Sequence, residues 1–207
     1  MNFRLAHDHS VILMSLRPNA PYRDEVPDGR TLIYEGHDAP KSSNNPLVKA
    51  LDQPQNTSSG GLTQNGKFYK AAKDYVSGIN SAEHVRVYEK LRAGIWANNG
   101  LFELVDSWVE DDGRRKVFKF KLSAIQERNS NDKPRLIAEG ISRRIIPTSV
   151  KLEVWKRDNG KCSMCGSNSE LHFDHIIPYA KGGTSLRADN IQLLCARHNL
   201  EKHDRIV

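Results

Sequence analysis

Three cysteines and one histidine near the C-terminal end most constrain how this chain can fold. Cys162 and Cys165 are separated by two residues, as are Cys195 and His198, and about thirty residues lie between the two pairs. Thiolates and imidazoles in two such pairs are typical ligands of tetrahedral zinc, whereas three cysteines do not suit a disulfide framework. We therefore predict a structural Cys₃His zinc site, with His203, one helical turn further on, as the alternative to His198.

The segment enclosed by these pairs predicts a small ββα unit. Leu171 to His175 reads as a strand, Gly182-Gly183 as a loop, Asn190 to Leu194 as a second strand, and Ala196 to Arg205 as a helix. A helix with Val150, Val154 and Trp155 on its apolar face is expected to precede it. A unit this small needs the zinc staple to stay folded.

At this point the sequence resembles the HNH nuclease superfamily of ββα-metal enzymes. The motif residues are Asp174-His175, Asn190 and Asn199, and the lead-in VWKRDNGKCSMCG and the tail C-x-x-H-N-x-x-K are also typical. The last motif position is Asn rather than His, as in the HNH domain of RNA-guided CRISPR nucleases and in many bacterial restriction enzymes. The resemblance covers about 60 residues and implies divalent-metal-dependent hydrolysis of DNA phosphodiester bonds.

The chemistry of that reaction suits the residue types. Histidine is a side chain whose pKa is able to sit near neutrality, so His175 is the natural general base for the attacking water. Asp174 and Asn199 offer hard oxygen ligands to Mg²⁺ or Mn²⁺, or to another divalent cation. On a regular strand, Asp174 and His175 point to opposite sides, so a local bend is needed for both to act on one phosphate.

Three further polar residues have expected roles at the same site. Asn190 is expected to hydrogen-bond loop backbone and hold His175 in place. His203 is a candidate third ligand of the catalytic cation or a phosphate contact. Lys202 is a candidate contact to the scissile phosphate, and an ordinary solvated lysine is an equal alternative.

The preceding part of the chain reads as mostly β. Strands are expected at Ser10 to Ser15 and at Thr31 to Glu35, as neighbours in a sheet, and in the runs HVRVYEKL, LFELVDSWV and RRKVFKFKL. Residues 36–66 are rich in Gly, Asn, Ser, Pro and Gln and predict a long loop, with one short helix around Leu47 to Leu51. Residues 67–79 predict a helix.

These elements resemble the SRA domain, the modified-cytosine reader of the PUA-like β-barrel class. The resemblance runs through VILMSLRPNAPYRDEVPDGRTLIYEGHD, Leu62 to Asn65, VRVYEKL and NGLFELVDSWVEDDGRRKVFKFKL, over about residues 10–125. It implies that a base is flipped out of the duplex into a pocket formed by two aromatic rings and a carboxylate.

Residue by residue, the resemblance places Tyr22 and Tyr34 on the aromatic positions of that pocket and Asp24 or Glu25 on the acid. Stacking tolerates any base, a carboxylate favours the exocyclic amine of cytosine, and a small cavity senses a 5-methyl or hydroxymethyl group. The alternative is that the two tyrosines are ordinary barrel residues.

Two further features point to DNA. Gln64 and Asn65, expected in a loop, are candidates to fill the vacated base stack. Between Gly113 and Arg157 there are 13 Lys or Arg and four acidic residues, within a chain of net charge +6. This excess, which includes Arg143 and Arg144, is typical of a phosphate-binding surface.

Together these features predict an α+β protein with a PUA-like SRA domain at residues 1–140 and a zinc-stapled HNH domain at residues 141–207. The expected function is a modification-dependent restriction endonuclease that reads 5-methyl- or 5-hydroxymethylcytosine in double-stranded DNA. It is expected to be cytoplasmic and not membrane-bound, and to act as a homodimer, because one HNH site cuts one strand. The alternatives are a homing or general HNH nuclease that cuts unmodified DNA, and a non-catalytic DNA-binding zinc protein.

Overall fold

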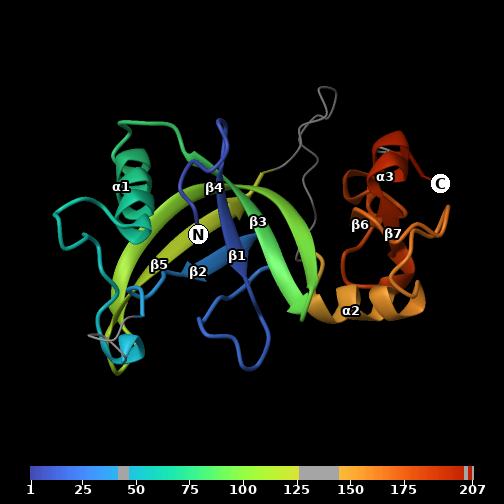
Figure 1. Cartoon of the computed structure of the whole chain (residues 1–207). Helices are drawn as coiled ribbons and strands as arrows, with labels where there is room; N and C mark the ends of the chain where they lie inside the picture. The colour runs from blue at the N-terminus through green and yellow to red at the C-terminus, as the bar shows by residue number, and fades with distance from the viewer. Residues whose placement is uncertain (42–46, 126–144, 203–204, 207) are drawn as a thin grey trace. The chain divides into compact units, whose positions relative to one another are not determined.

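A computed structural model describes residues 1–41, 47–125, 145–202 and 205–206 of the chain (Figure 1). Within them it is an α+β protein, as predicted. Seven strands and three α-helices are found in the described residues, together with three short 3₁₀ helices. The strands are β1 (Ser10–Met14), β2 (Thr31–Glu35), β3 (Glu83–Arg92), β4 (Ile95–Asp111), β5 (Lys116–Ala124), β6 (Leu171–His175) and β7 (Ile191–Cys195). The α-helices are α1 (Gln64–Val76), α2 (Thr148–Arg157) and α3 (Ala196–Lys202).

The chain divides into two compact units. The first comprises Met1–Pro27, Thr31–Tyr88 and Gly100–Ile125, and the second comprises Asp28–Arg30, Glu89–Asn99 and Gln126–Val207. The ends of β3 and β4, joined by their hairpin turn, thus cluster with the second unit. The predicted boundary between residues 140 and 141 falls outside the described residues and stays a prediction.

The first unit is built on a five-stranded sheet in the order β1-β3-β4-β5-β2, in which β5 pairs antiparallel with both β4 and β2. β1 and β2 stand at opposite ends of this order, so the expectation that they are neighbours is wrong. Both segments are strands, as predicted. The turn residues between them predict a pair of neighbouring strands, but β2 pairs instead with β5, some 80 residues later in the chain.

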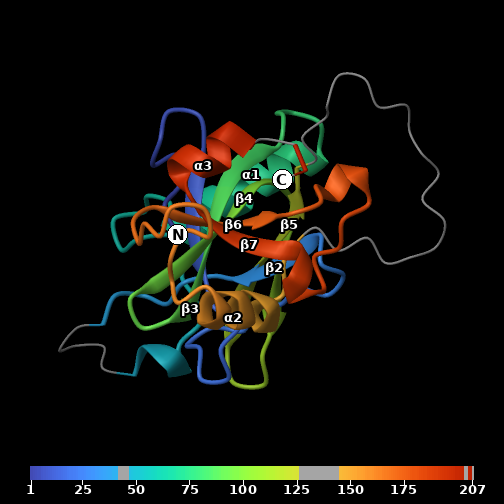
Figure 2. The same ribbon diagram turned by 90° about the vertical axis from the view of Figure 1, so that its right-hand side faces the viewer.

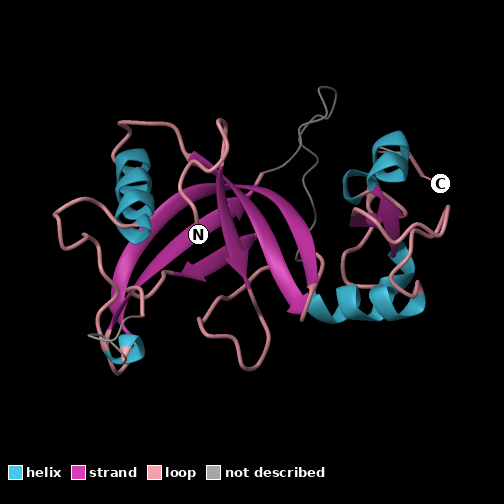
Figure 3. Ribbon diagram, viewed as in Figure 1, coloured by secondary structure: helices cyan, strands magenta, loops and turns pink. Residues whose placement is uncertain are grey.

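The first unit's core lies on one face of the sheet, beneath α1. In β5, alternation places Phe118, Phe120 and Leu122 in the core, and Phe68 of α1 meets Phe120 edge-on with 5.8 Å between ring centroids. Thr63 caps α1 by accepting a hydrogen bond from the backbone N–H of Gly66. Figure 3 shows α1 in cyan beside the magenta strands, which make up most of the regular secondary structure of this unit.

The second unit holds the antiparallel hairpin β6–β7 between α2 and α3 (Figure 2). Val150 and Val154 of α2 pack on Ile191 and Leu193 of β7, with Trp155 and Phe173 at the margin. The predicted strand Leu171 to His175 is β6, and the predicted strand and helix that follow it differ from β7 and α3 only at their ends.

Candidate functional site

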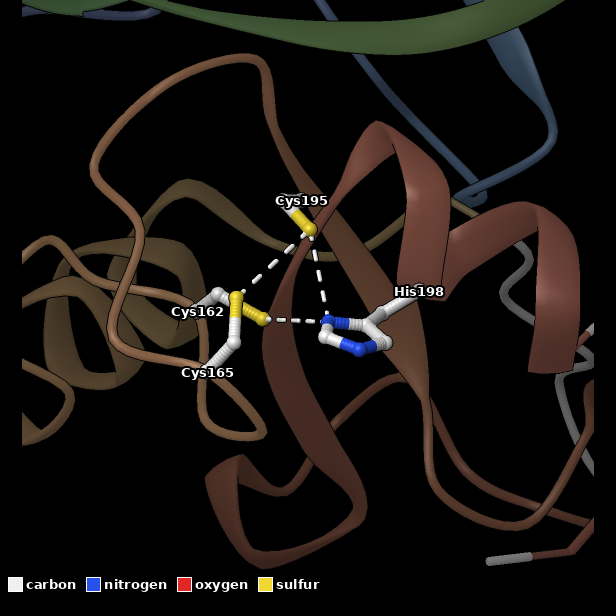
Figure 4. A group of neighbouring side chains, drawn as sticks. All are labelled: Cys162, Cys165, Cys195 and His198. Carbon is white, nitrogen blue, oxygen red and sulfur yellow. Dashed lines mark hydrogen bonds between the residues drawn. The ribbon is translucent and has the colours of Figure 1, made fainter.

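The four predicted zinc ligands gather at one point of the second unit (Figure 4). Cys162 and Cys165 lie in the turn after α2, Cys195 ends β7, and His198 lies in the first turn of α3. All four ligand atoms lie within 4.8 Å of one another. In the described part of the chain, no other group of three or more His, Cys, Asp or Glu side chains is arranged to hold a metal ion.

The distances between these atoms fit a tetrahedral ion. Zn–S bonds of about 2.3 Å and Zn–N bonds of about 2.0 Å place tetrahedral S and S atoms ~3.8 Å apart and S and N atoms ~3.5 Å apart. The Sγ atoms of Cys165 and Cys195 are 3.9 Å apart, and the Nδ1 of His198 is 3.4 Å from the Sγ atoms of both Cys162 and Cys195. The donor set and its geometry therefore suit Zn²⁺.

Local structure around Cys162 favours its thiolate. Burial opposes ionisation, but backbone N–H groups of Cys195, Cys165 and Met164 outweigh it and lower the pKa of the Cys162 thiol to about 6. On the other side of the cluster, the Nε2 of His198 lies 3.9 Å from a carboxylate oxygen of Glu201. At this distance the two groups are not hydrogen-bonded, and the Arg197 guanidinium lies closer to the same nitrogen, at 3.1 Å.

The HNH motif residues Asp174 and His175 end β6, opposite Gln192 and Ile191 of β7. The Nε2 of His175 lies 2.8 Å from the Oγ of Ser185, in the loop between the two strands. Ser185 was not singled out in the sequence, and its only signal there is its position just after the Gly-Gly turn. The contact engages the Nε2 of the imidazole and ties it to the loop between β6 and β7.

Asn190 holds that loop against β6. Its side-chain oxygen accepts from the backbone N–H of Ile177 at 2.9 Å, and its amide donates to the carbonyls of Ile177 and Thr184 at 3.2 and 3.0 Å. A Cβ at Gly183 would lie 1.8 Å from the Ile177 carbonyl oxygen and 2.8 Å from the Asn190 amide. Only glycine fits this approach, which explains the second glycine of the pair.

Lys202 lies inside the second unit rather than on its surface. Its side chain is 1% exposed, its Nζ is 2.9 Å from the Oδ2 of Asp174, and it donates to the backbone carbonyl of His175 at 2.7 Å. The ammonium thus fixes α3 to the end of β6 and places a positive charge on the carboxylate expected to bind the catalytic cation. Its predicted contact with the scissile phosphate stays a prediction.

Asn199 lies on α3 and is half-buried, and His203 lies outside the described residues. Asp174 and Asn199, from β6 and α3, supply the hard oxygen donors that Mg²⁺ or Mn²⁺ prefers. The Asp174 side chain is 19% exposed, so it remains reachable from solvent. This donor chemistry fits a catalytic divalent cation, whose further ligands would be water and phosphate oxygens.

In the first unit, the two tyrosines of the predicted base pocket are joined by a histidine that the sequence did not suggest. The ring of His37 stacks on Tyr22 at 15° with 5.3 Å between centroids, and its Nε2 lies 2.8 Å from the hydroxyl of Tyr34. Tyr34 is 1% exposed, and Tyr22 is half-buried. Burial lowers the pKa of His37 to about 4, so its imidazole is neutral at physiological pH.

The two candidate acids of that pocket differ in environment. Asp24 accepts from the backbone N–H groups of Ser15 and Glu35, both at 3.0 Å, and burial raises its pKa to about 6. Glu25 is exposed and bridges to Ile33 through its backbone. Of the two candidate acids, Asp24 is therefore the less exposed one.

Gln64 and Asn65 lie in the first turn of α1, so the expectation that they lie in a loop is wrong. Asn65 is 2% exposed and clamps His37, accepting from its backbone N–H and donating to its carbonyl, both at 2.8 Å. Gln64 accepts from the backbone N–H of Phe3. With Thr63 as its cap, the helix begins at Gln64, three residues before the predicted start at residue 67.

Part of the predicted basic surface is internal. Lys119 of β5, one of the basic residues between Gly113 and Arg157, is 4% exposed and lies 3.3 Å from the carboxylate of Glu35, its partner in the β2–β5 register. Arg115 is also buried and pairs with Asp38 at 2.7 Å. Arg143 and Arg144 lie outside the described residues, so their predicted DNA contacts stay predictions.

No helix in the described ranges is long and apolar enough to cross a membrane.

Comparison with protein families shows that residues 162–205 match the HNH endonuclease model. This match contains both predicted zinc pairs and the Asp174, His175, Asn190 and Asn199 motif residues. It supports a nuclease activity and covers less than half of the chain. No curated protein matches the chain.

Among solved structures, the chain is similar to "SUVH5 SRA- hemi methylated CG DNA complex" at 24% identity and a TM-score of 0.38, over 56% of this chain and 64% of that one. It is similar to SUVH5 SRA bound to fully hydroxymethylated CG DNA at 22% identity and a TM-score of 0.36, over 56% and 63%. A third is KRYPTONITE in complex with mCHG DNA and SAH, at 15% identity and a TM-score of 0.38, over 60% and 24%. This chain thus spans less than two thirds of the length of each.

Proposed function

We propose that this chain is a modification-dependent DNA endonuclease, in which the second unit cuts and the first unit reads 5-methyl- or 5-hydroxymethylcytosine. The observation that carries the nuclease part is the Asp174-His175 pair at the end of β6, set in a Cys₃His-stapled ββα unit whose residues 162–205 match the HNH endonuclease family. DNA is the expected partner.

In the proposed mechanism, His175 removes a proton from the water that attacks the phosphorus. The hydrogen bond between its Nε2 and Ser185, and the Asn190 clamp on the loop, orient the imidazole. Asp174 and Asn199 would hold Mg²⁺ or Mn²⁺, which neutralises charge on the phosphate and stabilises the leaving oxygen. The zinc cluster, with four protein ligands, has a structural role only.

The proposed reader uses Tyr22, Tyr34 and Asp24. Tyr22 supplies a half-buried ring, which stacks on His37 and has the Lys49 ammonium 3.9 Å from its centroid. A base would have to displace one of these two groups to stack on it. Tyr34 supplies a buried ring whose hydroxyl meets the Nε2 of His37. Asp24 is the buried carboxylate of the group, and a carboxylate favours the N4 amino group of cytosine. Base flipping and the choice between methyl and hydroxymethyl groups belong to this proposal.

The experiment compares matched duplexes that contain cytosine, 5-methylcytosine or 5-hydroxymethylcytosine, incubated with the protein and Mg²⁺ or Mn²⁺ and resolved on a denaturing gel. We expect cutting of a modified duplex and no cutting by His175→Ala, which should still bind DNA and zinc. Equal cutting of all three duplexes would leave a general or homing-type nuclease and discard the base reader. Binding without cutting under any divalent cation would leave a non-catalytic zinc protein.

The base reader is tested separately with Tyr22→Ala, because Tyr34 is fully buried and its removal would also disturb the core. Tyr22→Ala should erase the preference for modified DNA and keep basal nicking. Tyr75→Ala, at a tyrosine 38% exposed on α1, is the matched control and should keep the preference. A Tyr22→Ala protein that still discriminates would refute the pocket.

A further inference from the structure

The second unit contains a surface groove that is separate from both the zinc cluster and the HNH motif. It has a volume of about 420 Å³ and is lined by Arg92 at the end of β3, by Leu152, Trp155 and Lys156 of α2, and by Asn159 just after that helix. None of the residues assigned above to catalysis or metal binding lines it. Two cations, an amide and two apolar side chains thus form one concave surface.

The two cations of the groove are uncompensated. Arg92 and Lys156 are both exposed, and neither lies within ion-pair distance of a carboxylate in the described residues. Three other cations of the same unit are paired. Arg157 pairs with Asp158 at 2.7 Å, Lys202 with Asp174 at 2.9 Å, and Arg187 with Asp189. The groove therefore concentrates positive charge that no carboxylate of the described ranges neutralises.

The apolar part of the groove is held rigidly. Trp155 packs on the core of Val150, Val154, Ile191 and Leu193, and Leu152 stays 39% exposed beside it. Gly160 has a φ of +62°, and a Cβ there would lie 2.7 Å from the indole. Because Gly160 has no Cβ, its backbone can pack directly against the indole of Trp155 and hold the ring that lines the groove.

The two sides of the groove are also fixed to each other. Lys151 of α2, 2% exposed, donates to the Glu89 carboxylate of β3 at 2.6 Å and to the Asn99 side chain of β4 at 2.5 Å. Thr148 donates to the same carboxylate. These contacts join α2 to the β3–β4 end that carries Arg92, so the spacing between Arg92 and Lys156 is preorganised.

We propose that this groove binds the sugar-phosphate backbone of duplex DNA away from the scissile phosphate. Arg92 and Lys156 would neutralise phosphates, and the indole and Leu152 would pack against deoxyribose. Such contacts position a duplex without reading its sequence. The inference rests on the proposed function only in taking DNA as the substrate, and requires neither modified-base reading nor catalysis.

The test measures the affinity of the full-length zinc-loaded chain for an unmodified fluorescent duplex by anisotropy, across a salt series. A His175→Ala background prevents cleavage. We expect Arg92→Gln/Lys156→Gln to weaken binding at least tenfold and to reduce the slope of log affinity against log salt by about one for each lost phosphate contact. Leu152→Glu, which adds a carboxylate at an exposed position, should weaken binding comparably.

Arg187→Gln/Lys161→Gln is the control for net charge, because it removes the same charge from exposed positions of the same unit outside the groove, one of them paired with Asp189. We expect it to change affinity less than threefold. Equal losses in the groove and control pairs would mean that only net charge matters, and unchanged binding by the groove variants would also overturn the proposal. Tighter binding of a single strand than of the duplex would refute the duplex as occupant. A parent protein that binds no DNA at all would refute the proposed function itself.

Discussion

His37 and Asp24 are both partly buried beside the tyrosines. Their shifted pKa values make the stability of the fold depend on pH in opposite directions. The folded pKa of His37, about 4, lies below its ordinary value of 6.5, so its stability contribution is lost as pH falls from about 6.5 towards 4. The folded pKa of Asp24, about 6, lies above its ordinary value of 3.8. Its contribution is present at low pH and is lost as pH rises through about 6.

We therefore predict that His37→Gln loses less thermal stability than the parent protein when the pH is lowered from 7 to 5. The substitution removes the group that must stay neutral in the fold, and an amide can still meet the Tyr34 hydroxyl. Differential scanning fluorimetry at the two pH values measures the effect.

Asp24→Asn is the opposing control and should lose more stability on acidification than the parent, because the acid that gains a proton in the fold is gone. Parallel melting curves for all three proteins across this range would contradict the assignment of these pKa shifts.

Sequence reasoning succeeded for residues whose spacing carries chemistry and failed for residues whose partners lie far along the chain. The two pairs of predicted zinc ligands converge because C-x-x-C and C-x-x-H each fix a local turn. His37 reaches the tyrosines only because Asn65, 28 residues later, clamps its backbone. Lys119 belongs to the predicted basic surface, but the β2–β5 register brings Glu35 opposite it, and that pairing is non-local.

At the scale of elements, α2 is attached to the β3–β4 end by a buried ion pair. Burial alone would raise the pKa of the Glu89 carboxyl, but the Lys151 ammonium and the bonds from Lys151, Thr148 and Asn99 hold it below its ordinary value. The pair is therefore ionised. Removal of one partner leaves a buried charge without compensation.

We predict that Lys151→Met lowers the free energy of unfolding by about 3–5 kcal/mol. Glu89→Gln/Lys151→Met should recover part of that loss, because no charge is then left buried. Urea denaturation followed by circular dichroism measures the double variant and the two single variants, Lys151→Met and Glu89→Gln. A double variant as unstable as the sum of the two single variants would show that the two side chains are not coupled.

The zinc cluster ties the turn after α2 to the end of β7 and the start of α3, so its loss should affect the second unit first. We predict that Cys162→Ser, or removal of zinc by a chelator, melts this unit at lower temperature and abolishes cleavage. Zinc content by mass spectrometry and thermal melting measure this.

Met164→Leu is the control, because Met164 lies between the two cysteines, is 52% exposed and offers no ligand to this site. It should keep zinc, melting temperature and cleavage. An unchanged melting temperature for Cys162→Ser would disprove the zinc site.

The elements themselves were largely predictable, and their arrangement was not. β6, β7 and α2 follow from apolar periodicity, since Val150 and Val154 or Ile191 and Leu193 recur on one face. Periodicity carries no information on which strands pair, so β1 and β2 were wrongly expected to be neighbours. It also gave no sign that Glu89–Asn99 belongs with the second unit.

At the scale of the whole molecule, one proposed HNH site per chain limits what one protein molecule can do. A single site hydrolyses one strand, so a double-strand break needs two sites acting together. A homodimer remains a prediction, and it can be tested with the intact chain.

We predict that a supercoiled plasmid containing modified cytosine is first converted to the nicked form and only later to the linear form, with linearisation rising more steeply than nicking with protein concentration. Gel electrophoresis of a time course measures both steps, and sedimentation of the protein with and without DNA reports association. Nicked and linear forms that appear together, at a ratio independent of concentration, would contradict this order.

The second unit is discontinuous in sequence, because Glu89–Asn99 lies within the strands of the first unit. No single crossover between two genes can therefore exchange the nuclease unit intact. A chimera joined between β5 and α2 would combine α2 from one parent with the Glu89 and Asn99 of the other, and its Lys151 would meet a foreign partner. Recombination should favour exchanges that keep this hairpin and α2 from the same ancestor, so the two segments are expected to be inherited together across related chains.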